Sequence, residues 1–522
     1  MSDAPAIATL RDLQASGYRP RSVKDEVRAN LLKKLRAGEE VFPGVLGYEK
    51  TVVPQIQHAL MARHDLILLG LRGQAKSRIV RLLTTLLDEW VPVVEGSEIH
   101  DDPLKPISKY ARDLVAQQGG DTPVVWLHRS QRYGEKLATP DTSIADLIGD
   151  IDPIKAATRK LTYADEEVIH FGIIPRTNRG IFAINELPDL QPRIQVGLLN
   201  IMEEQDVQIR GFNVRIPLDL LMVFTANPED YTNRGSIITP LKDRIDSQIL
   251  THYPKELETG IEITRQEAWH DRQGVGDDVP MVHVPHVFRE IVEQIAFEAR
   301  ASEYVDQKSG VSARLTRAAL EALISAAERR AILNGESETT VRVADLAAVE
   351  PAVTGKVELV YEGEQEGAAS VAHALVGKAV ASIFKRYFPD PGSRPAGSRA
   401  AGRRAGAAPA DAGRATYADV LGWFAGGNAL VLDPDVPDSV YRDALDRVDG
   451  LRTLVARHTT PTTSGERAAA MELVLEALHQ HSMLGKEKVD DRATYADMMG
   501  SVLGHITPPD DEDEEDEYRR FG

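Results

Sequence analysis

The chain has 522 residues, which at roughly 100–200 residues per domain indicates several folded units and excludes a single small binding module. It contains no cysteine, so a disulfide framework, a zinc–thiolate site, an iron–sulfur cluster and a cysteine nucleophile are excluded. Its 61 basic and 80 acidic residues give a formal charge of −19, which disfavours non-specific binding to nucleic acid or to anionic lipid.

The same composition bears on where the protein resides. The absence of cysteine suits a reducing compartment, and residues 1–15 carry no apolar run long enough for a signal peptide. No later segment offers the roughly 18 consecutive apolar residues that a transmembrane helix requires. We therefore expect a cytoplasmic protein without a membrane span.

The first half of the chain carries the pattern of an α/β domain. Residues 1–40 are polar, with basic clusters, and are expected to form an N-terminal helical extension. The pattern changes at residues 41–47, and we expect the α/β core to span residues 41–255. Continuous apolar runs in this region suit the strands of a parallel sheet covered on both faces, with helices between them. These runs lie at residues 66–69, 124–127, 181–184 and 220–224.

The second half of the chain is mostly helical in pattern. Residues 256–355 are expected to form a connector and an α-helical subdomain, with a helical extension at 356–390. Residues 391–413 are rich in Ala, Gly, Arg and Pro, and are expected to form a flexible linker. We expect a C-terminal helical domain at 414–505 and an acidic disordered tail at 506–522.

A glycine-rich loop, GLRGQAKS at residues 70–77, directly follows the predicted strand at 66–69. In such a loop backbone N–H groups cradle phosphates, the lysine reaches the β- and γ-phosphates, and the next hydroxyl ligates Mg²⁺. Ala75 stands where the usual pattern has glycine, and a left-handed backbone there costs roughly 1–2 kcal/mol. An incidental glycine-rich turn is the alternative. The predicted ATP-binding residues of this loop are Gly70, Gly73, Gln74, Ala75, Lys76, Ser77, which would also ligate Mg²⁺, and Arg78.

A second candidate site is the end of the apolar run at 181–184, where Asn185 and Glu186 follow. A nucleoside triphosphatase needs one carboxylate to orient the attacking water and another to hold the hydrated Mg²⁺. Glu186 suits the first role. Asn185 stands where Asp is usual, so it is expected to hold Mg²⁺ through water with one negative charge fewer. In isolation, Glu186 could equally be a surface acid after a core strand.

Three further polar residues are candidates for the same chemistry. Asn227 follows the run at 220–224 and could hydrogen-bond the γ-phosphate or the attacking water. Arg244 and Arg314 each offer a guanidinium that could stabilise phosphate charge by bidentate contact. Taken singly, each arginine is more typical of a solvated surface residue.

Together these motifs resemble, in order and over residues 43–350, those of the AAA+ ATPases. The similarity is to the branch that contains MoxR-like ATPases and the ATPase subunit of magnesium chelatase. Residues 145–152 and 171–176 resemble the helix-2 insert of that branch, and residues 198–204 and 207–211 the helix and hairpin after its Walker B motif. The resemblance implies an adenine-side segment at 45–48 with Tyr48, a Walker A motif at 70–77 and a Walker B motif at 184–186. It further implies that Asn227 is sensor 1, that Arg244 is the arginine finger and that Arg314 is sensor 2.

The resemblance also implies a fold, cofactors and partners. It implies a P-loop core with an α-helical lid, which bind ATP and Mg²⁺, and a homo-oligomeric ring that is usually a hexamer. Arg244 of one subunit would reach the phosphate held by Lys76 of the next. Hydrolysis would drive the remodelling of a protein partner, which in this branch commonly carries a von Willebrand factor A domain.

Rival functions stay open on the sequence alone. A magnesium chelatase-like subunit would drive metal insertion into a tetrapyrrole, although the long C-terminal addition disfavours this. A nucleotide-responsive scaffold with little turnover is compatible with Ala75 and Asn185. A sigma-54 activator would need a GAFTGA loop, and a fused protease would need a Gly-x-Ser-x-Gly or His-Glu-x-x-His motif; the sequence has none of these.

Overall fold

The computed structural model describes residues 3–152, 154–155, 158, 166–208, 215–228, 236–272, 279–392, 415–489 and 492–498. The chain divides into two compact units, Met1–Lys255 and Glu256–Gly522. The expected linker at 391–413 lies outside the described residues except for its first two, and the expected acidic tail at 506–522 lies outside them entirely.

The first unit is built around a five-stranded sheet with the strand order β11-β1-β10-β7-β4. All four neighbouring pairs are parallel, which confirms the predicted α/β class. The register sets Leu69 beside Ala226 and Ile184 beside Phe224, so the carboxyl ends of the three central strands lie at one edge. The strands are β1 (Leu66–Leu69), β4 (Tyr133–Leu137), β7 (Gly180–Asn185), β10 (Leu220–Ala226) and β11 (Ser247–Leu250).

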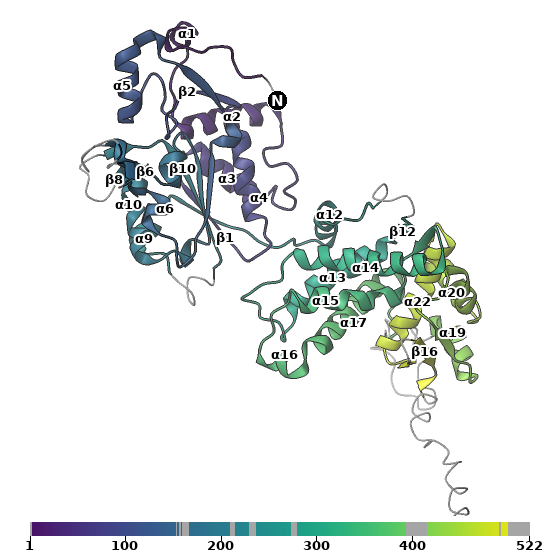
Figure 1. Ribbon diagram of the computed structural model, residues 1–522. Helices are drawn as coiled ribbons and strands as arrows, with labels where there is room; N and C mark the ends of the chain where they lie inside the picture. The colour runs from purple at the N-terminus through teal and green to yellow at the C-terminus, as the bar shows by residue number, and fades with distance from the viewer. Residues whose placement is uncertain are drawn as a thin grey trace, which may run out of the picture. The chain divides into compact units, whose positions relative to one another are not determined.

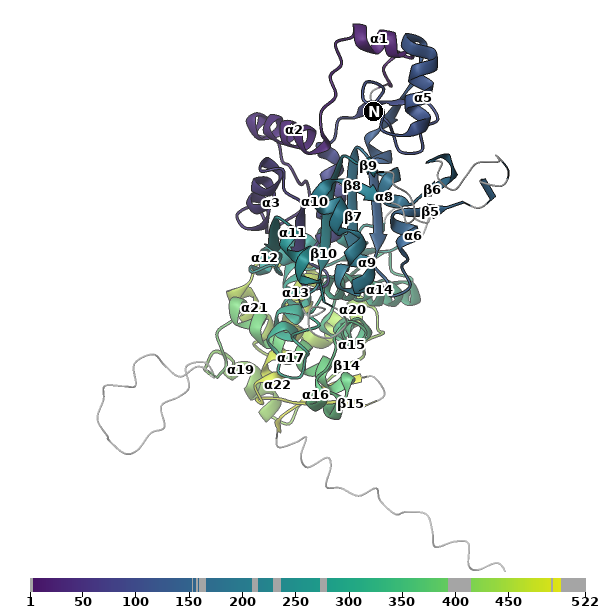
Figure 2. The same cartoon turned by 90° about the vertical axis from the view of Figure 1, so that its left-hand side faces the viewer.

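Helices cover both faces of this sheet, as Figures 1 and 2 show from two directions. Successive strand residues point to opposite faces, so Leu66 and Leu68 belong to one hydrophobic cluster and Ile67 and Leu69 to another. The first face is covered by α2 (Val23–Ala37), α3 (Val52–Met61) and α4 (Lys76–Leu82), and the second by α6 (Ile144–Leu147), α8 (Ile173–Arg176), α9 (Pro192–Gly197), α10 (Leu199–Glu204) and α11 (Thr239–Arg244).

The helix α2 lies in the segment expected to be an N-terminal extension, and it packs against the sheet. Val27 and Leu31 are buried in the same cluster as Leu66. Glu26, also buried, accepts two 2.7 Å hydrogen bonds from the guanidinium of Arg132. This helix is therefore packed as part of the core rather than standing apart from it.

One predicted strand of the sheet lies elsewhere. Residues 124–127 form β3 (Val124–His128), which pairs antiparallel with β2 (Trp90–Val94) outside the central sheet, so the expectation of a parallel core strand there is wrong. The two outer places are taken by β4 and β11, which are edge strands, and a strand paired on one side only can carry polar residues.

The first unit contains further elements outside the central sheet. They are α1 (Leu10–Ala15), α5 (Lys109–Gln118), β5 (Gly149–Ile151), β6 (Ile169–Phe171), β8 (Asp206–Gln208) and β9 (Arg215–Pro217). The β5–β6 and β8–β9 hairpins fall where the insert and the post-Walker B hairpin are expected, although residues 159–165 and 209–214 lie outside the described residues.

The second unit is mainly helical, as expected, and one hydrophobic cluster joins its helices. Long helices α13 and α17 pack together, and α17 in turn contacts α22. Its helices are α12 (Leu257–Glu267), α13 (His286–Ala301), α14 (Arg314–Asn334), α15 (Glu350–Thr354), α16 (Tyr361–Glu366), α17 (Ala368–Tyr387), α19 (Ala418–Ala425), α20 (Asp438–Leu445), α21 (Leu451–His458) and α22 (Ser464–Gln480).

The second unit also contains β-structure that the sequence reading did not anticipate. The segment expected to be a helical C-terminal domain contributes an antiparallel sheet of order β14-β16-β15, in which Tyr495 is buried and donates a hydrogen bond to Glu476. The strands are β12 (Met281–His283), β13 (Glu338–Thr340), β14 (Leu430–Leu432), β15 (Gly485–Val489) and β16 (Arg492–Ala496).

In the parts of the chain that the structure describes, no helix combines the length and the apolar character needed to cross a membrane.

Candidate functional site

The glycine-rich loop joins the end of β1 to the start of α4, as predicted. Ala75 is the residue before the helix, and its backbone is left-handed, with φ of 57° and ψ of 12°. The first turn of the helix is held by a 3.0 Å hydrogen bond from the Ile79 N–H to the Ala75 carbonyl oxygen. Alanine therefore occupies the position where glycine would be free of strain, at a cost of roughly 1–2 kcal/mol.

The glycine-rich loop is held in place by contacts with the segment that follows β11. Gln74 is buried, and its side-chain oxygen accepts a 2.6 Å hydrogen bond from the Thr251 hydroxyl. A Cβ at Gly70 would lie 1.8 Å from that hydroxyl oxygen, so only glycine fits there. Tyr253 donates a 2.8 Å hydrogen bond to the carbonyl oxygen of Arg72. These contacts fix the backbone of the loop before any ligand arrives.

Tyr48, which the resemblance places on the adenine side, lies buried against the same loop. Its hydroxyl is 2.7 Å from the His252 carbonyl oxygen and 3.1 Å from that of Gln74. Burial raises the pKa of Tyr48 to about 12, so the hydroxyl stays protonated and can donate at neutral pH. The contacts that the structure shows for Tyr48 thus go to the loop backbone.

Lys76 and Asn227 are brought together by the pairing of β1 with β10. The Gly70 N–H donates to the Ala226 carbonyl oxygen at 3.1 Å, which sets the residues after the two strands side by side. The buried Lys76 ammonium donates to Asn227 Oδ1 at 3.0 Å and also to the carbonyl oxygens of Gly70 and Leu71. Ser77 and Arg78, next along α4, are exposed.

Asn185 and Glu186 end the next strand, β7. The Thr225 hydroxyl donates to Asn185 Oδ1 at 3.1 Å and accepts from the Glu186 N–H at 3.2 Å. Glu186 has a left-handed backbone, with φ of 53°, so the chain turns sharply where the strand ends. A non-glycine residue in the left-handed backbone conformation costs on the order of 1–3 kcal/mol of stability, and such residues are concentrated at functional sites.

The structure adds a residue that sequence reasoning missed. The amide nitrogen of Asn185 donates a 2.5 Å hydrogen bond to Glu135 of the edge strand β4. Glu135 in turn pairs with Arg81 of α4, with Nε and Oε2 at 3.2 Å. The sequence at 133–137, Tyr-Gly-Glu-Lys-Leu, has neither a continuous apolar run nor a clear alternation, so nothing in it pointed to a strand beside Walker B.

The two candidate arginines lie in different units of the chain. Arg244 ends α11, where its guanidinium pairs with Glu203 of α10 and donates to the Pro240 carbonyl oxygen at 2.8 Å. Its side chain is 27% exposed, so it is accessible to another molecule. Arg314 is exposed at the first position of α14, in the second unit.

The donor chemistry at the strand ends fits a magnesium ion. Mg²⁺ prefers oxygen ligands and is usually held by one or two carboxylates, waters and the phosphates of its nucleotide. Such oxygens are offered by Ser77 on α4, by Asn185 at the end of β7, by Glu186 directly after that strand, and by Glu135 on β4. Within the described residues, no group of three or more His, Asp or Glu side chains is placed so that it could hold a metal ion by itself.

No family model matches the sequence. Among solved structures, a Cytophaga hutchinsonii protein to which ATPase activity has been ascribed is 16% identical, with 70% of this chain and 97% of that chain covered, at a TM-score of 0.28. A complex of the magnesium chelatase subunits BchI and BchD matches at 20% identity over 62% and 98%, at a TM-score of 0.32.

NtrX from Brucella abortus is also similar, at 12% identity and a TM-score of 0.33, and the chain spans about 56% of its length. The same protein in complex with ADP matches at a TM-score of 0.35. Likeness at this level does not identify a family, so the function has to be inferred from the site itself.

Proposed function

We propose that the chain is an AAA+ ATPase of the MoxR and magnesium chelatase type, which binds ATP with Mg²⁺ and hydrolyses it. The observation that carries this is the order of polar residues along three neighbouring strand ends: Lys76 after β1, Asn227 after β10, and Asn185 with Glu186 at β7. Lys76 and Asn227 are already 3.0 Å apart. In open parallel sheets ligands bind outside the carboxyl ends of the strands.

Each of these residues has a defined task in phosphoryl transfer. Lys76 would exchange the loop carbonyls for the β- and γ-phosphate oxygens, which are stronger acceptors for an ammonium group. Glu186 would orient the attacking water and accept its proton, and Asn227 would hydrogen-bond the γ-phosphate or that water. Bound Mg²⁺ would neutralise charge on the phosphates, held by Ser77 and, through water, by Asn185.

A homo-oligomeric ring, hexameric in the implied family, would complete the site. Arg244 would leave its partly exposed pair with Glu203, which at the surface contributes only about 0–1 kcal/mol, and reach the phosphate held by a neighbouring subunit. Arg314 of the helical unit would contact the nucleotide as sensor 2. The ring would remodel a protein partner, one with a von Willebrand factor A domain in this proposal.

Mg²⁺-dependent ATP hydrolysis across a series of protein concentrations tests the proposal. Activity should rise with assembly, and Glu186→Gln and Arg244→Ala should both abolish it. Glu203→Ala is the matched control, because it removes the partner of Arg244 but keeps the arginine, and it should remain active. If the wild type hydrolyses ATP no faster than Glu186→Gln at any protein concentration, the proposed motor function is overturned.

A scaffold that responds to nucleotide with little turnover is the second candidate. Two observations favour it: the strained left-handed Ala75 in the phosphate loop, and Asn185, which lacks the usual charge beside the metal. Such a protein would bind ATP tightly and change its partner affinity, yet would hydrolyse ATP no faster than Glu186→Gln. The same assay, with nucleotide binding measured in parallel, separates the two functions.

A further inference from the structure

The replacement of the usual Walker B aspartate by Asn185 leaves the strand end one negative charge short. In the structure, however, a carboxylate lies directly against that amide. Glu135 Oε1 is 2.5 Å from Asn185 Nδ2, and the two residues come from adjacent parallel strands. The charge that is absent from β7 is therefore present one strand away.

Sheet geometry places this carboxylate on the side of the phosphate loop. Leu137 is the register partner of Asn185, and Glu135, two residues earlier, points to the same face. On β7 that face also carries Ala183, which is buried in one cluster with Ile79 of α4. Glu135 and the helix that begins with Lys76 and Ser77 thus share one face of the sheet.

The present partner of Glu135 is weakly held. Arg81 of α4 forms the ion pair, but its side chain is 66% exposed, whereas that of Glu135 is 24% exposed. Exposed pairs of this kind contribute about 0–1 kcal/mol, because water and salt screen them. A divalent cation at the loop could therefore recruit the carboxylate without a large penalty.

We propose that Glu135 supplies the negative charge of the magnesium site that Asn185 no longer provides. It would act as a positioning residue, either through a metal-bound water or through the Asn185 amide that it orients. This inference rests on the proposed nucleotide-binding function and concerns the metal requirement of that same site.

Binding of a fluorescent ADP analogue to the full-length chain, titrated with MgCl₂, tests this without relying on hydrolysis. Glu135→Gln should raise the Mg²⁺ concentration needed for half-maximal enhancement of binding by about 10–100-fold, the usual effect of losing an outer-shell partner, while affinity without Mg²⁺ is kept. Glu135→Asp, which retains the charge on a shorter side chain, should shift it less. Asn185→Asp in the Glu135→Gln background should restore it.

The matched control is Arg81→Gln, which breaks the same ion pair but leaves Glu135 in place. It should not raise the Mg²⁺ midpoint. A wild-type midpoint in Glu135→Gln would overturn the proposal, and so would an equal loss of affinity with and without Mg²⁺, since that would mean a structural role. If the wild type binds no nucleotide, the proposed function itself fails; if it binds nucleotide without Mg²⁺ dependence, only the role of Glu135 fails.

Discussion

The two units of the chain each contain a polar network anchored by arginine, and the two networks differ in burial. In the second unit, Arg330 of α14 pairs with Asp345, and their side chains are 1% and 6% exposed. In the first unit, Arg81 pairs with Glu135 at exposures of 66% and 24%. We infer that the first arrangement fixes a structure, whereas the second can change partners.

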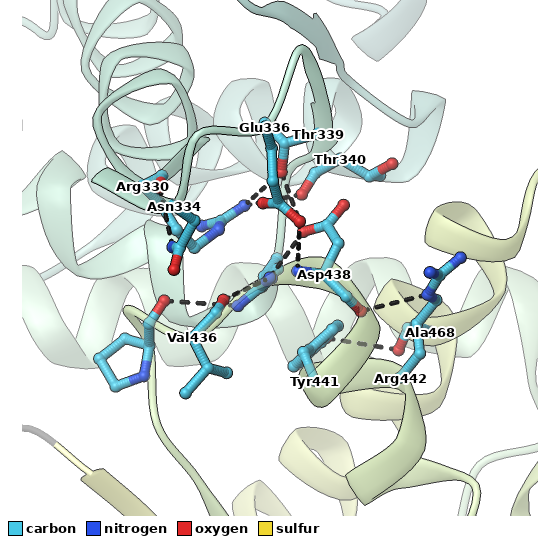
Figure 3. Close-up of polar contacts among 12 residues, drawn as sticks. Arg330, Asn334, Glu336, Thr339, Thr340, Val436, Asp438, Tyr441, Arg442 and Ala468 are labelled. Atoms are coloured by element: carbon cyan, nitrogen blue, oxygen red, sulfur yellow. Dashed lines mark hydrogen bonds and ion pairs between the residues drawn. The ribbon is translucent and has the colours of Figure 1, made fainter. Parts of the chain in front are cut away.

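Figure 3 draws other polar contacts around Arg330, in which Arg330 and Asp438 come from different helices and lie beside β13. Arg330 donates to the Thr340 carbonyl oxygen at 2.9 Å, and Thr339 donates to Asp438 at 3.0 Å. Asp438 also accepts a 2.6 Å hydrogen bond from Arg342, whose guanidinium lies 4.2 Å from the centre of the Tyr441 ring. These contacts tie residues 434–441 to the helical subdomain within the second unit.

The role of an ion pair therefore depends on its burial, and the number of ion pairs does not indicate it. A buried pair that loses one partner leaves an uncompensated charge in a low-dielectric interior, whereas a half-exposed pair loses little because water replaces it. The strand ends of the first unit are therefore suited to ligand exchange.

The largest effect is expected for Arg330→Met, which leaves Asp345 buried without its main partner. Burial raises the pKa of Asp345, so protonation relieves part of the penalty, and we expect a loss of about 3–5 kcal/mol of unfolding free energy. Chemical denaturation, with amide hydrogen exchange along α14, measures it. Arg329→Met is the control, because its pair with Asp435 is exposed at 66% and 58% and should cost at most about 1 kcal/mol. If both variants lose the same unfolding free energy, burial does not distinguish the two kinds of ion pair.

The first unit also contains a buried acid, Asp219, which directly precedes β10 at the end of the sheet opposite the candidate site. Both carboxylate oxygens of Asp219 accept from the single Val23 N–H, yet burial raises the pKa of Asp219 to about 6, while this hydrogen bond and Arg179 lower it. The folded state then binds more protons than the unfolded state between about pH 4 and pH 6, so stability falls as pH rises through that window. At about 1.4 kcal/mol for each pKa unit, the rise from 3.8 to about 6 corresponds to a contribution of about 3 kcal/mol.

Asp219→Asn should remove that slope. The measurement is the difference in unfolding free energy between wild type and Asp219→Asn at a series of pH values, since other titrating groups cancel in the difference. The difference should change between about pH 4 and pH 6 and stay flat above. A flat difference throughout would show that burial does not raise the pKa of Asp219.

The strain in the phosphate loop gives a smaller effect of the opposite sign. Ala75→Gly should stabilise the chain by about 0.5–1 kcal/mol, because relief of the left-handed alanine exceeds the entropy that glycine adds to the unfolded chain. Ala62→Gly is the control: Ala62 directly follows α3 and has an ordinary φ of −81°, so glycine there should destabilise the chain by up to about 1 kcal/mol. Destabilisation by both variants would mean that Ala75 is not strained.

The sequence predicted the parts of the site that lie on continuous apolar strands, and missed those on polar ones. Lys76, Asn227 and Glu186 each follow an apolar run, so local pattern alone placed them at strand ends. Glu135 lies on an edge strand with polar residues, and its approach to Asn185 depends on β4 pairing with β7, which no local pattern specifies. The same reason explains the error at residues 124–127, where apolar character was right but the pairing partner was not.

The smallest effect is expected at the exchangeable pair itself. Arg81→Gln makes the same kind of change as Arg330→Met, since it takes a guanidinium away from a carboxylate, but the carboxylate that remains is one quarter exposed and still accepts from Asn185. We expect a change in unfolding free energy of at most about 1 kcal/mol, measured by denaturation, and less at high salt. A loss comparable to that of Arg330→Met would show that the strand-end network is as firmly held as the buried one, and the inference that it can change partners would then fail.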